Sequence, residues 1–140
     1  QGVPKDFKLA YKWYAKAAEK GFAKAQFLLG NSYLTGQGVP KDFKLAFEWF
    51  AKSAEQGFGT AQTFLGLMYG RGKGIPQDYI KGYMWINLSI TQFKNTTYKT
   101  KIKNVANRAI NNFEKKMTPE QIAKAKQLAS QCYAKKFKGC

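Results

Sequence analysis

The amino-acid sequence predicts an all-α protein, a right-handed α-solenoid of helix-turn-helix repeats with a 36-residue period and a C-terminal helical cap. The first observation is an internal repeat. GVPKDFKLA at residues 2–10 returns unchanged at 38–46 and in altered form, GIPQDYIKG, at 74–82, and residues 2–37 and 38–73 are identical at 22 of 36 positions. The second is a helical spacing of apolar residues in each unit. The third is a hydrophobic content of 44% in 140 residues, enough to bury one core.

Each unit is expected to contain two helices. In the first, over residues 23–34, Ala25, Leu29 and Tyr33 follow one another at i, i+4 and i+8, and the same residue types recur at 61, 65 and 69. This spacing is the apolar stripe of an amphipathic helix. Glycines at 36, 38, 72 and 74 are predicted to end these helices, because glycine adopts a positive φ at little cost.

The second helix of each unit is predicted to begin at an aspartate. Asp42 and Asp78, each two residues after a proline, are expected to accept hydrogen bonds from the free backbone amides of the helix that follows. Trp13 and Trp49 recur at one register beside small alanines. We therefore expect both rings to be largely buried between the two helices of their units.

We predict that residues 1–92 form the repeats and that residues 93–140 form the cap. The first unit lacks its first helix, and the third unit is degenerate, because Asn87 and Ile90 replace two small alanines of the first. The chain opens inside a motif that recurs later, so we expect the natural N-terminus to lie upstream.

The cap is expected to contain two helices, since an end repeat presents a polar outer face to water. Residues 97–116 form a basic segment with one narrow apolar stripe at positions 102, 105, 109 and 113. Thr118, Pro119 and Gln121 then form a helix-start signature, with Thr as the N-cap and Gln reaching back as in a capping box. The last helix is predicted to run to about Tyr133.

The repeated positions follow the pattern A-x-x-x-L-G-x-x-Y-x-x-G-x-G-V-x-x-D-x-x-x-A-x-x-W-x-x-x-x-A-x-x-G. This pattern resembles the Sel1-like repeat family, a relative of the tetratricopeptide repeats, and MTPEQIAKAKQLA resembles the helix that often follows the repeats in bacterial members. The resemblance implies that the chain binds another protein. It would be an adaptor or scaffold for a multiprotein complex, in bacteria often in the envelope, or an immunity or effector-associated protein.

Solenoid repeats leave an inner surface free of packing, and we expect the partner, another protein or peptide, to bind there. The candidate residues are non-repeating positions at i, i+3 and i+7 on the first helix of two units. They are Lys24, Phe27, Asn31, Thr60, Thr63 and Leu67. An exposed Phe27 and Leu67 among polar neighbours would suit a peptide or helix groove. Alternatively, both side chains pack between units.

No catalytic residue is evident in the sequence, and we expect no enzymatic activity, no cofactor and no metal site. Histidine, the commonest general base and metal ligand, does not occur in the sequence. Five of the eight acidic residues recur at equivalent repeat positions, which indicates a structural role. The alternative is a peptidoglycan- or β-lactam-directed hydrolase, as described for some cysteine-rich secreted family members. None of the four serines here begins the S-x-x-K motif of such enzymes.

The formal charge of +16 is concentrated in the C-terminal half, where 14 of the 24 basic residues fall within positions 73–140. Such a charge attracts nucleic acid, anionic lipid or an acidic partner, so nucleic-acid binding is an alternative function. Its candidate residues are Tyr98, Lys99, Lys101, Lys103, Arg108, Phe113, Lys115 and Lys116. This alternative is less favoured, because only two of the 24 basic residues are arginine, the residue that contacts bases in bidentate fashion.

Cys132 and Cys140 lack the spacing of a redox C-x-x-C motif and have no partners for a zinc site. They either form a disulfide in an exported protein or remain free thiols in a cytosolic one. The disulfide is favoured, because an even pair near a terminus has little other use, and it predicts a periplasmic or secreted location. No run of about 18 apolar residues occurs, so no segment is predicted to span a membrane.

Overall fold

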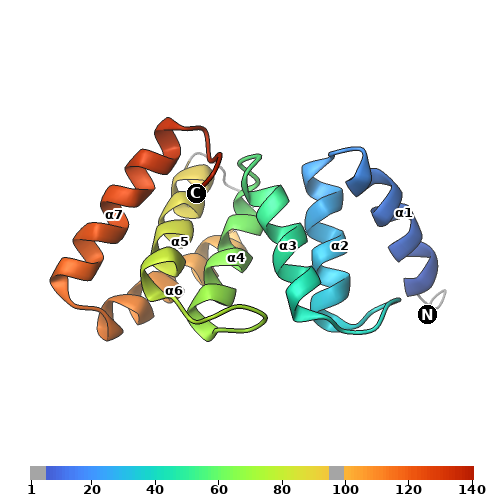
Figure 1. Ribbon diagram of the computed structural model, residues 1–140, viewed down its shortest axis with the longest axis horizontal. Coiled ribbons are helices and arrows are strands. Elements are labelled where there is room, and N and C mark those ends of the chain that lie inside the picture. Colours follow the sequence, from blue (N-terminus) through green and yellow to red (C-terminus); the bar gives the residue numbers. More distant parts are fainter. Residues whose placement is uncertain (1–5, 95–99) are drawn as a thin grey trace.

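The computed structural model describes residues 6–94 and 100–140, and all regular secondary structure in these ranges is α-helical (Figure 1). The helices within these ranges are α1 (Phe7–Glu19), α2 (Ala23–Thr35), α3 (Phe43–Ala54), α4 (Gly59–Arg71), α5 (Tyr79–Phe93), α6 (Thr100–Lys116) and α7 (Pro119–Ala134). Helices α2 and α3 form one repeat unit, and α4 and α5 form the next. The predicted all-α solenoid of helical repeats is confirmed.

The helix boundaries follow from recurring cap residues, as predicted. Asp6, Asp42 and Asp78 are the N-caps of α1, α3 and α5, and each carboxylate accepts a hydrogen bond of 3.0 Å from the backbone N–H three residues further on. Gly36 and Gly72 end α2 and α4 in the left-handed conformation, with φ of 76° and 68°. A glycine adopts this conformation without the steric cost that a Cβ would add.

The helices form two rows. The α2–α4–α6 row is joined by the rings of Phe27 and Phe64, whose centroids lie 5.1 Å apart, and by the packing of α6 on α4. In the second row, Trp49 of α3 packs near Tyr11 and Tyr14 of α1, α3 and α5 share one core, and α7 packs on α5. Figure 1 shows the first five helices following one another along the long axis of the molecule, with α7 at the far end.

An aromatic cluster lies where two units meet. Phe27, Phe50, Phe58 and Phe64 make four ring contacts with centroid separations between 5.1 and 5.7 Å. Phe50 is completely buried and also lies against Gly30 of the preceding helix. Large buried rings contribute strongly to the free energy of unfolding, so this cluster is a main support of the solenoid.

The tryptophans do not lie where we expected. Trp13 is 63% exposed, Trp49 is half-buried, and Trp85, at the same register, is 2% exposed. The expected burial of Trp13 is therefore wrong. Trp49 packs against a cluster of Ala18 from α1 and Ala25 and Leu29 from α2, so this register meets the preceding unit as well as the other helix of its own unit. No described helix precedes α1, and the ring of Trp13 stays in contact with solvent.

The cap begins with α6, which packs on α4 and α5. We expected this helix to start at residue 97; it is described from Thr100, and residues 97–99 lie outside the described ranges. The predicted capping box of α7 is confirmed. The Thr118 hydroxyl accepts a hydrogen bond of 3.1 Å from the Gln121 N–H, and the Gln121 side-chain oxygen accepts one of 2.9 Å from the Thr118 N–H.

The C-terminal tail folds back from α7. Cys132 and Cys140 are joined by a disulfide, and Lys136 and Phe137 adopt positive φ values of 53° and 69°. The Phe137 ring lies against Gly57, in the turn between α3 and α4. In Figure 1 the chain end accordingly returns from α7 towards α5. Positive φ at a non-glycine residue costs about 1 kcal/mol or more, which the disulfide and the ring contact offset.

Replacing Phe50 tests the role of the aromatic cluster. Phe50→Ala is expected to lower the free energy of unfolding by about 3–5 kcal/mol, because it leaves a cavity among three other rings. Trp13→Ala is the matched control, since it removes a larger ring from an exposed position and should change stability by about 0.5 kcal/mol or less. Urea unfolding followed by circular dichroism measures both. Equal losses in the two variants would contradict the packing described here.

The disulfide gives a second prediction. Alkylation of the unreduced protein should leave Cys132 and Cys140 unmodified in mass spectra, and both should react after reduction. Cys140→Ala is expected to lower the free energy of unfolding by about 2–3 kcal/mol under oxidising conditions, because the unfolded chain regains the entropy of a short loop. In the presence of a reductant the variant and the parent should be equally stable. Modification of both thiols without reductant would show that the bond does not form.

Candidate functional site

The six predicted partner-binding residues do not all lie on an open surface. Lys24 is exposed, and Asn31, Thr60 and Leu67 are half-buried. Leu67 packs in part against the cluster that contains Tyr83 and Ile86, so the alternative of packing between helices holds in part for this residue. Thr63 is completely buried, and its hydroxyl donates a hydrogen bond of 3.2 Å to the Gly59 carbonyl oxygen. The expectation that all six positions line an accessible surface is therefore wrong for Thr63.

Packing against neighbouring helices explains the positions of Phe27 and Thr63. Phe27 is half-buried in the aromatic cluster, so for this residue the alternative of packing between units holds. Thr63 lies one turn after Gly59 on the same face of α4, and Gly59 lies against the Phe93 ring of α5. Four positions remain for contact with a partner. We call Lys24, Asn31, Thr60 and Leu67 the α2–α4 face.

A pocket of about 140 Å³ continues this face between α4, α6 and the start of α5. Its apolar lining comes from Leu67, Gly70, Tyr79, Ala109 and Phe113, and its polar lining comes from Arg71, Asn112 and Lys116. Sequence reasoning found only Leu67 in this set. Arg71 could have been found, because it is a further non-repeating position on the first helix. Lys116 could not, because nothing in the repeat pattern says where α6 packs.

The pocket carries positive charge at its rim. Arg71 lies in the last turn of α4 and Lys116 in the last turn of α6, and both side chains are exposed. The Lys116 ammonium lies 5.9 Å from the centroid of the Tyr79 ring. Within the described residues, neither cation forms an ion pair with an acid. The pocket can therefore offer two cations and an apolar wall to a single ligand.

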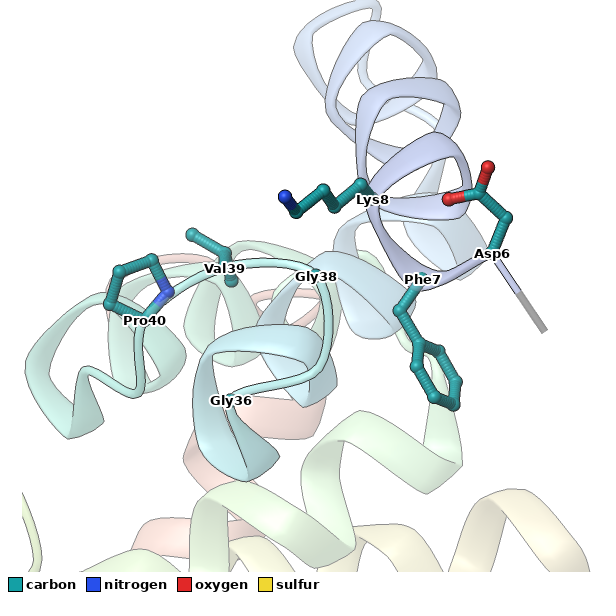
Figure 2. A pocket seen from close by; sticks show the side chains of 7 residues that line it. All are labelled: Asp6, Phe7, Lys8, Gly36, Gly38, Val39 and Pro40. Atoms are coloured by element: carbon teal, nitrogen blue, oxygen red, sulfur yellow. The ribbon is translucent and has the colours of Figure 1, made fainter. Parts of the chain in front are cut away.

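A second pocket, of about 850 Å³, lies at the other end of the chain (Figure 2). It is lined by Asp6, Phe7, Lys8, Gly36, Gly38, Val39 and Pro40. In Figure 2 the loop through Gly38 runs against the start of α1, while the side chains of Phe7 and Lys8 point in different directions. Asp6 is already used as the N-cap of α1. Residues 1–5, directly before it, lie outside the described ranges, and we assign this pocket no function.

The described residues show no arrangement suited to catalysis. Buried or half-buried serines donate to backbone oxygens, with Ser53 donating to Ala23 at 2.7 Å and Ser89 to Ile86 at 2.7 Å. No group of three or more potential metal-ligating side chains occurs within residues 6–94 and 100–140. None of the helices described there is long and apolar enough to cross a membrane.

The nucleic-acid alternative loses one of its two aromatic residues. Phe113 is buried beneath α6, so its ring is not available to stack on a base. Tyr98 and Lys99 lie outside the described residues. The exposed cations of this set among the described residues are Lys101, Arg108, Lys115 and Lys116, and they give α6 a positive surface charge.

Comparison with known proteins places these features in a family. The family model of the Sel1 repeat matches residues 1–22, 23–58 and 59–92. The chain is 36% identical to c5321, a protective antigen of uropathogenic Escherichia coli strains that displays an SLR fold, with a TM-score of 0.82 over 96% of this chain and 27% of c5321. It is 33% identical to a Sel1 repeat protein from Oxalobacter formigenes, with a TM-score of 0.62 over 72% of this chain and 69% of that one. The chain thus spans about a quarter of c5321. Among curated proteins, no match was found.

Three tyrosines between the helices give a prediction on pH. Burial raises the pKa of Tyr33 from 10.0 to about 12, helped by its hydrogen bond with Tyr11. Burial also raises the pKa of Tyr69, and that of Tyr83, which donates to Glu114 at 2.7 Å. A raised pKa means that the folded protein holds these protons more tightly than the unfolded chain. The contribution of these hydroxyl groups to the free energy of unfolding is therefore fully present below pH 10. It should be lost as the pH rises from 10 towards 12.

Urea unfolding across this alkaline range measures the fall. Tyr33→Phe keeps the ring and removes the titrating hydroxyl, so the free energy of unfolding of this variant should decline less steeply with pH. The same slope in the variant and the parent would contradict the assignment.

Proposed function

We propose that this chain, which belongs to the Sel1 repeat family, is a scaffold that binds another protein along its α2–α4–α6 row. Proteins with Sel1 repeats generally mediate protein–protein interactions. One observation carries the choice of surface. Along α2 and α4 most of the positions that are buried in both helices carry the same residue, at 25 and 61, 26 and 62, 29 and 65, and 30 and 66, with Ser32 against Met68 as the exception. The accessible positions of the α2–α4 face differ, with Lys24 against Thr60 and Asn31 against Leu67.

This pattern indicates that the repeated side chains and the varied side chains of each helix have different roles. The repeated side chains form the core and keep the spacing of the rows constant. The varied side chains are accessible and differ in charge and polarity, so the face presents a distinct sequence of contacts to a partner. A rigid helical row also binds at a lower entropic cost than a flexible loop, because its side chains are already held in place.

The proposal is of a binding protein without catalysis. The Sel1 repeat fold is typically a non-catalytic scaffold. The fully buried Ser53 and Ser89 hydroxyls point to backbone oxygens, which gives a serine-based hydrolase no support. Roles as an immunity or effector-associated protein would use the same binding face, and no observation on this chain favours them over a scaffold.

We also propose that the protein works in the periplasm or outside the cell. The disulfide between Cys132 and Cys140 supports this location, because such bonds persist in oxidising compartments and are rare in the cytosol.

The test uses full-length protein to capture a partner, followed by measurement of the dissociation constant with the purified partner. Lys24→Glu and Leu67→Ala should each weaken binding by about fivefold or more, because each removes a contact from the α2–α4 face. Lys44→Glu is the matched control: it makes the same charge change at an exposed position of α3, in the other row, and should leave binding nearly unchanged. Sensitivity to Lys44→Glu together with indifference to the two face variants would place the partner elsewhere.

A further inference from the structure

We infer that the partner is acidic, and that the pocket between α4 and α6 anchors it by holding one of its Asp or Glu side chains between Arg71 and Lys116. This inference rests on the proposed function and names the chemistry of the partner. An apolar side chain next to that acid would pack against Leu67 and Tyr79. Three features of the molecule support this inference: its surface charge, the lining of the pocket and the size of the pocket.

The surface of this chain is strongly positive, with a formal net charge of +16. There are 24 basic and 8 acidic residues, and all eight acids lie in the described ranges. Three of the carboxylates cap helices, namely those of Asp6, Asp42 and Asp78, and a fourth, that of Glu114, accepts a hydrogen bond from Tyr83. These four carboxylates keep their charge, but the basic residues still outnumber the acidic ones by three to one. A surface of this kind attracts acidic proteins and speeds their association.

The pocket provides a defined position for a carboxylate, which a diffuse surface charge does not. Arg71 and Lys116 come from two different helices and meet at one rim, and no acidic side chain is among the lining residues. Asn112 adds a further polar group at the same rim. The wall beneath them is apolar, with Leu67, Tyr79 and Phe113. A carboxylate bound there would be partly shielded from water, so its attraction to both cations would be stronger than on an open surface.

Helix capping does not fully account for these two cations. Both lie in the last turn of a helix, where a positive side chain is favoured by about 0.3–1 kcal/mol through the helix dipole. That effect acts on each helix separately. It gives no reason for the two last turns to converge, nor for the apolar pocket between them.

The size of the pocket selects the ligand. A volume of about 140 Å³ equals that of a few water molecules, at about 30 Å³ each in the liquid, so the pocket admits side chains of a partner and excludes a whole helix or domain. The Phe113 ring is buried in the pocket wall, which leaves Tyr79 as the accessible ring of the lining. A short acidic and apolar segment of a protein fits both the volume and the lining.

The experiment measures peptide binding to the full chain by fluorescence anisotropy. The probe is a fluorescein-labelled peptide of alternating Glu and Leu with an amidated C-terminus, and the matched peptide has Gln in place of Glu. The Glu peptide should bind at least about tenfold more tightly than the Gln peptide. The variants Arg71→Gln and Lys116→Gln should each weaken binding of the Glu peptide by about tenfold, because each removes a charge-assisted hydrogen bond.

Lys115→Gln is the control variant, since it makes the same charge change on an exposed neighbour that does not line the pocket. This variant should weaken binding of the Glu peptide by about twofold or less, as expected for an exposed charge in solvent. An equal loss in Lys115→Gln would overturn the inference, because the attraction would then be diffuse. Equal binding of the Gln peptide, or no binding of the Glu peptide at millimolar concentration, would overturn it as well.

Two further arms separate other sources of negative charge. A Glu peptide with a free C-terminus should bind as the amidated one does, and binding by the free form alone would assign the pocket to a chain terminus. Single-stranded DNA that binds more tightly than the peptide and is released by Arg71→Gln would assign it to nucleic acid. Failure of these peptide tests leaves the proposed function standing, because that proposal is tested by Lys24→Glu, at a position outside the pocket, against the protein partner.

Discussion

The fold depends on the close approach of the two helices within each repeat unit. A Cβ at Gly30 would lie 2.8 Å from ring atoms of Phe50, and a Cβ at Gly66 would lie 2.7 Å from Ile86, so only glycine fits at either position. Gly30 and Gly66 are 36 residues apart, and so are their contact partners, Phe50 and Ile86. The same contact therefore recurs from unit to unit, and it fixes the spacing between the two rows of helices.

Close packing of this kind leaves polar groups in the interior, and repeated side chains satisfy many of them. The Ser53 hydroxyl donates to the Ala23 carbonyl oxygen at 2.7 Å, and the Gln56 amide donates at 2.8 Å to both the Gly21 carbonyl oxygen and the Gln26 side-chain oxygen. These bonds tie the end of α3 to the start of α2. Because the turns are held in this way, the α2–α4–α6 row behaves as a rigid support, and its accessible side chains can differ without disturbing the core.

Most of the fold could be predicted from the sequence because the features that define it recur: the aspartate caps, the glycine stops and the capping box at Thr118 lie as expected. The tryptophans show the limit of this reasoning. A register establishes that Trp13 and Trp49 are equivalent, but not which neighbouring unit their rings face. The site could be predicted only in part for the same reason. Spacing on one helix identified Leu67, whereas Lys116 reaches the pocket through the packing of α6, which no repeat specifies.

The end of the repeat pattern also creates the pocket. The residue that would continue Gly30 and Gly66 is Ile102, so α6 and α7 lack the contact that holds the other units together, and α6 packs on α4 and α5 while α7 packs on α5. Phe113 of α6 then fills the space above Gly82, and the last turn of α6 comes to lie beside Arg71. A pocket formed in this way belongs to one end of the solenoid and does not recur in the preceding unit. A partner that uses it must bind in a single register and direction along the row, which a surface made only of repeats would not require.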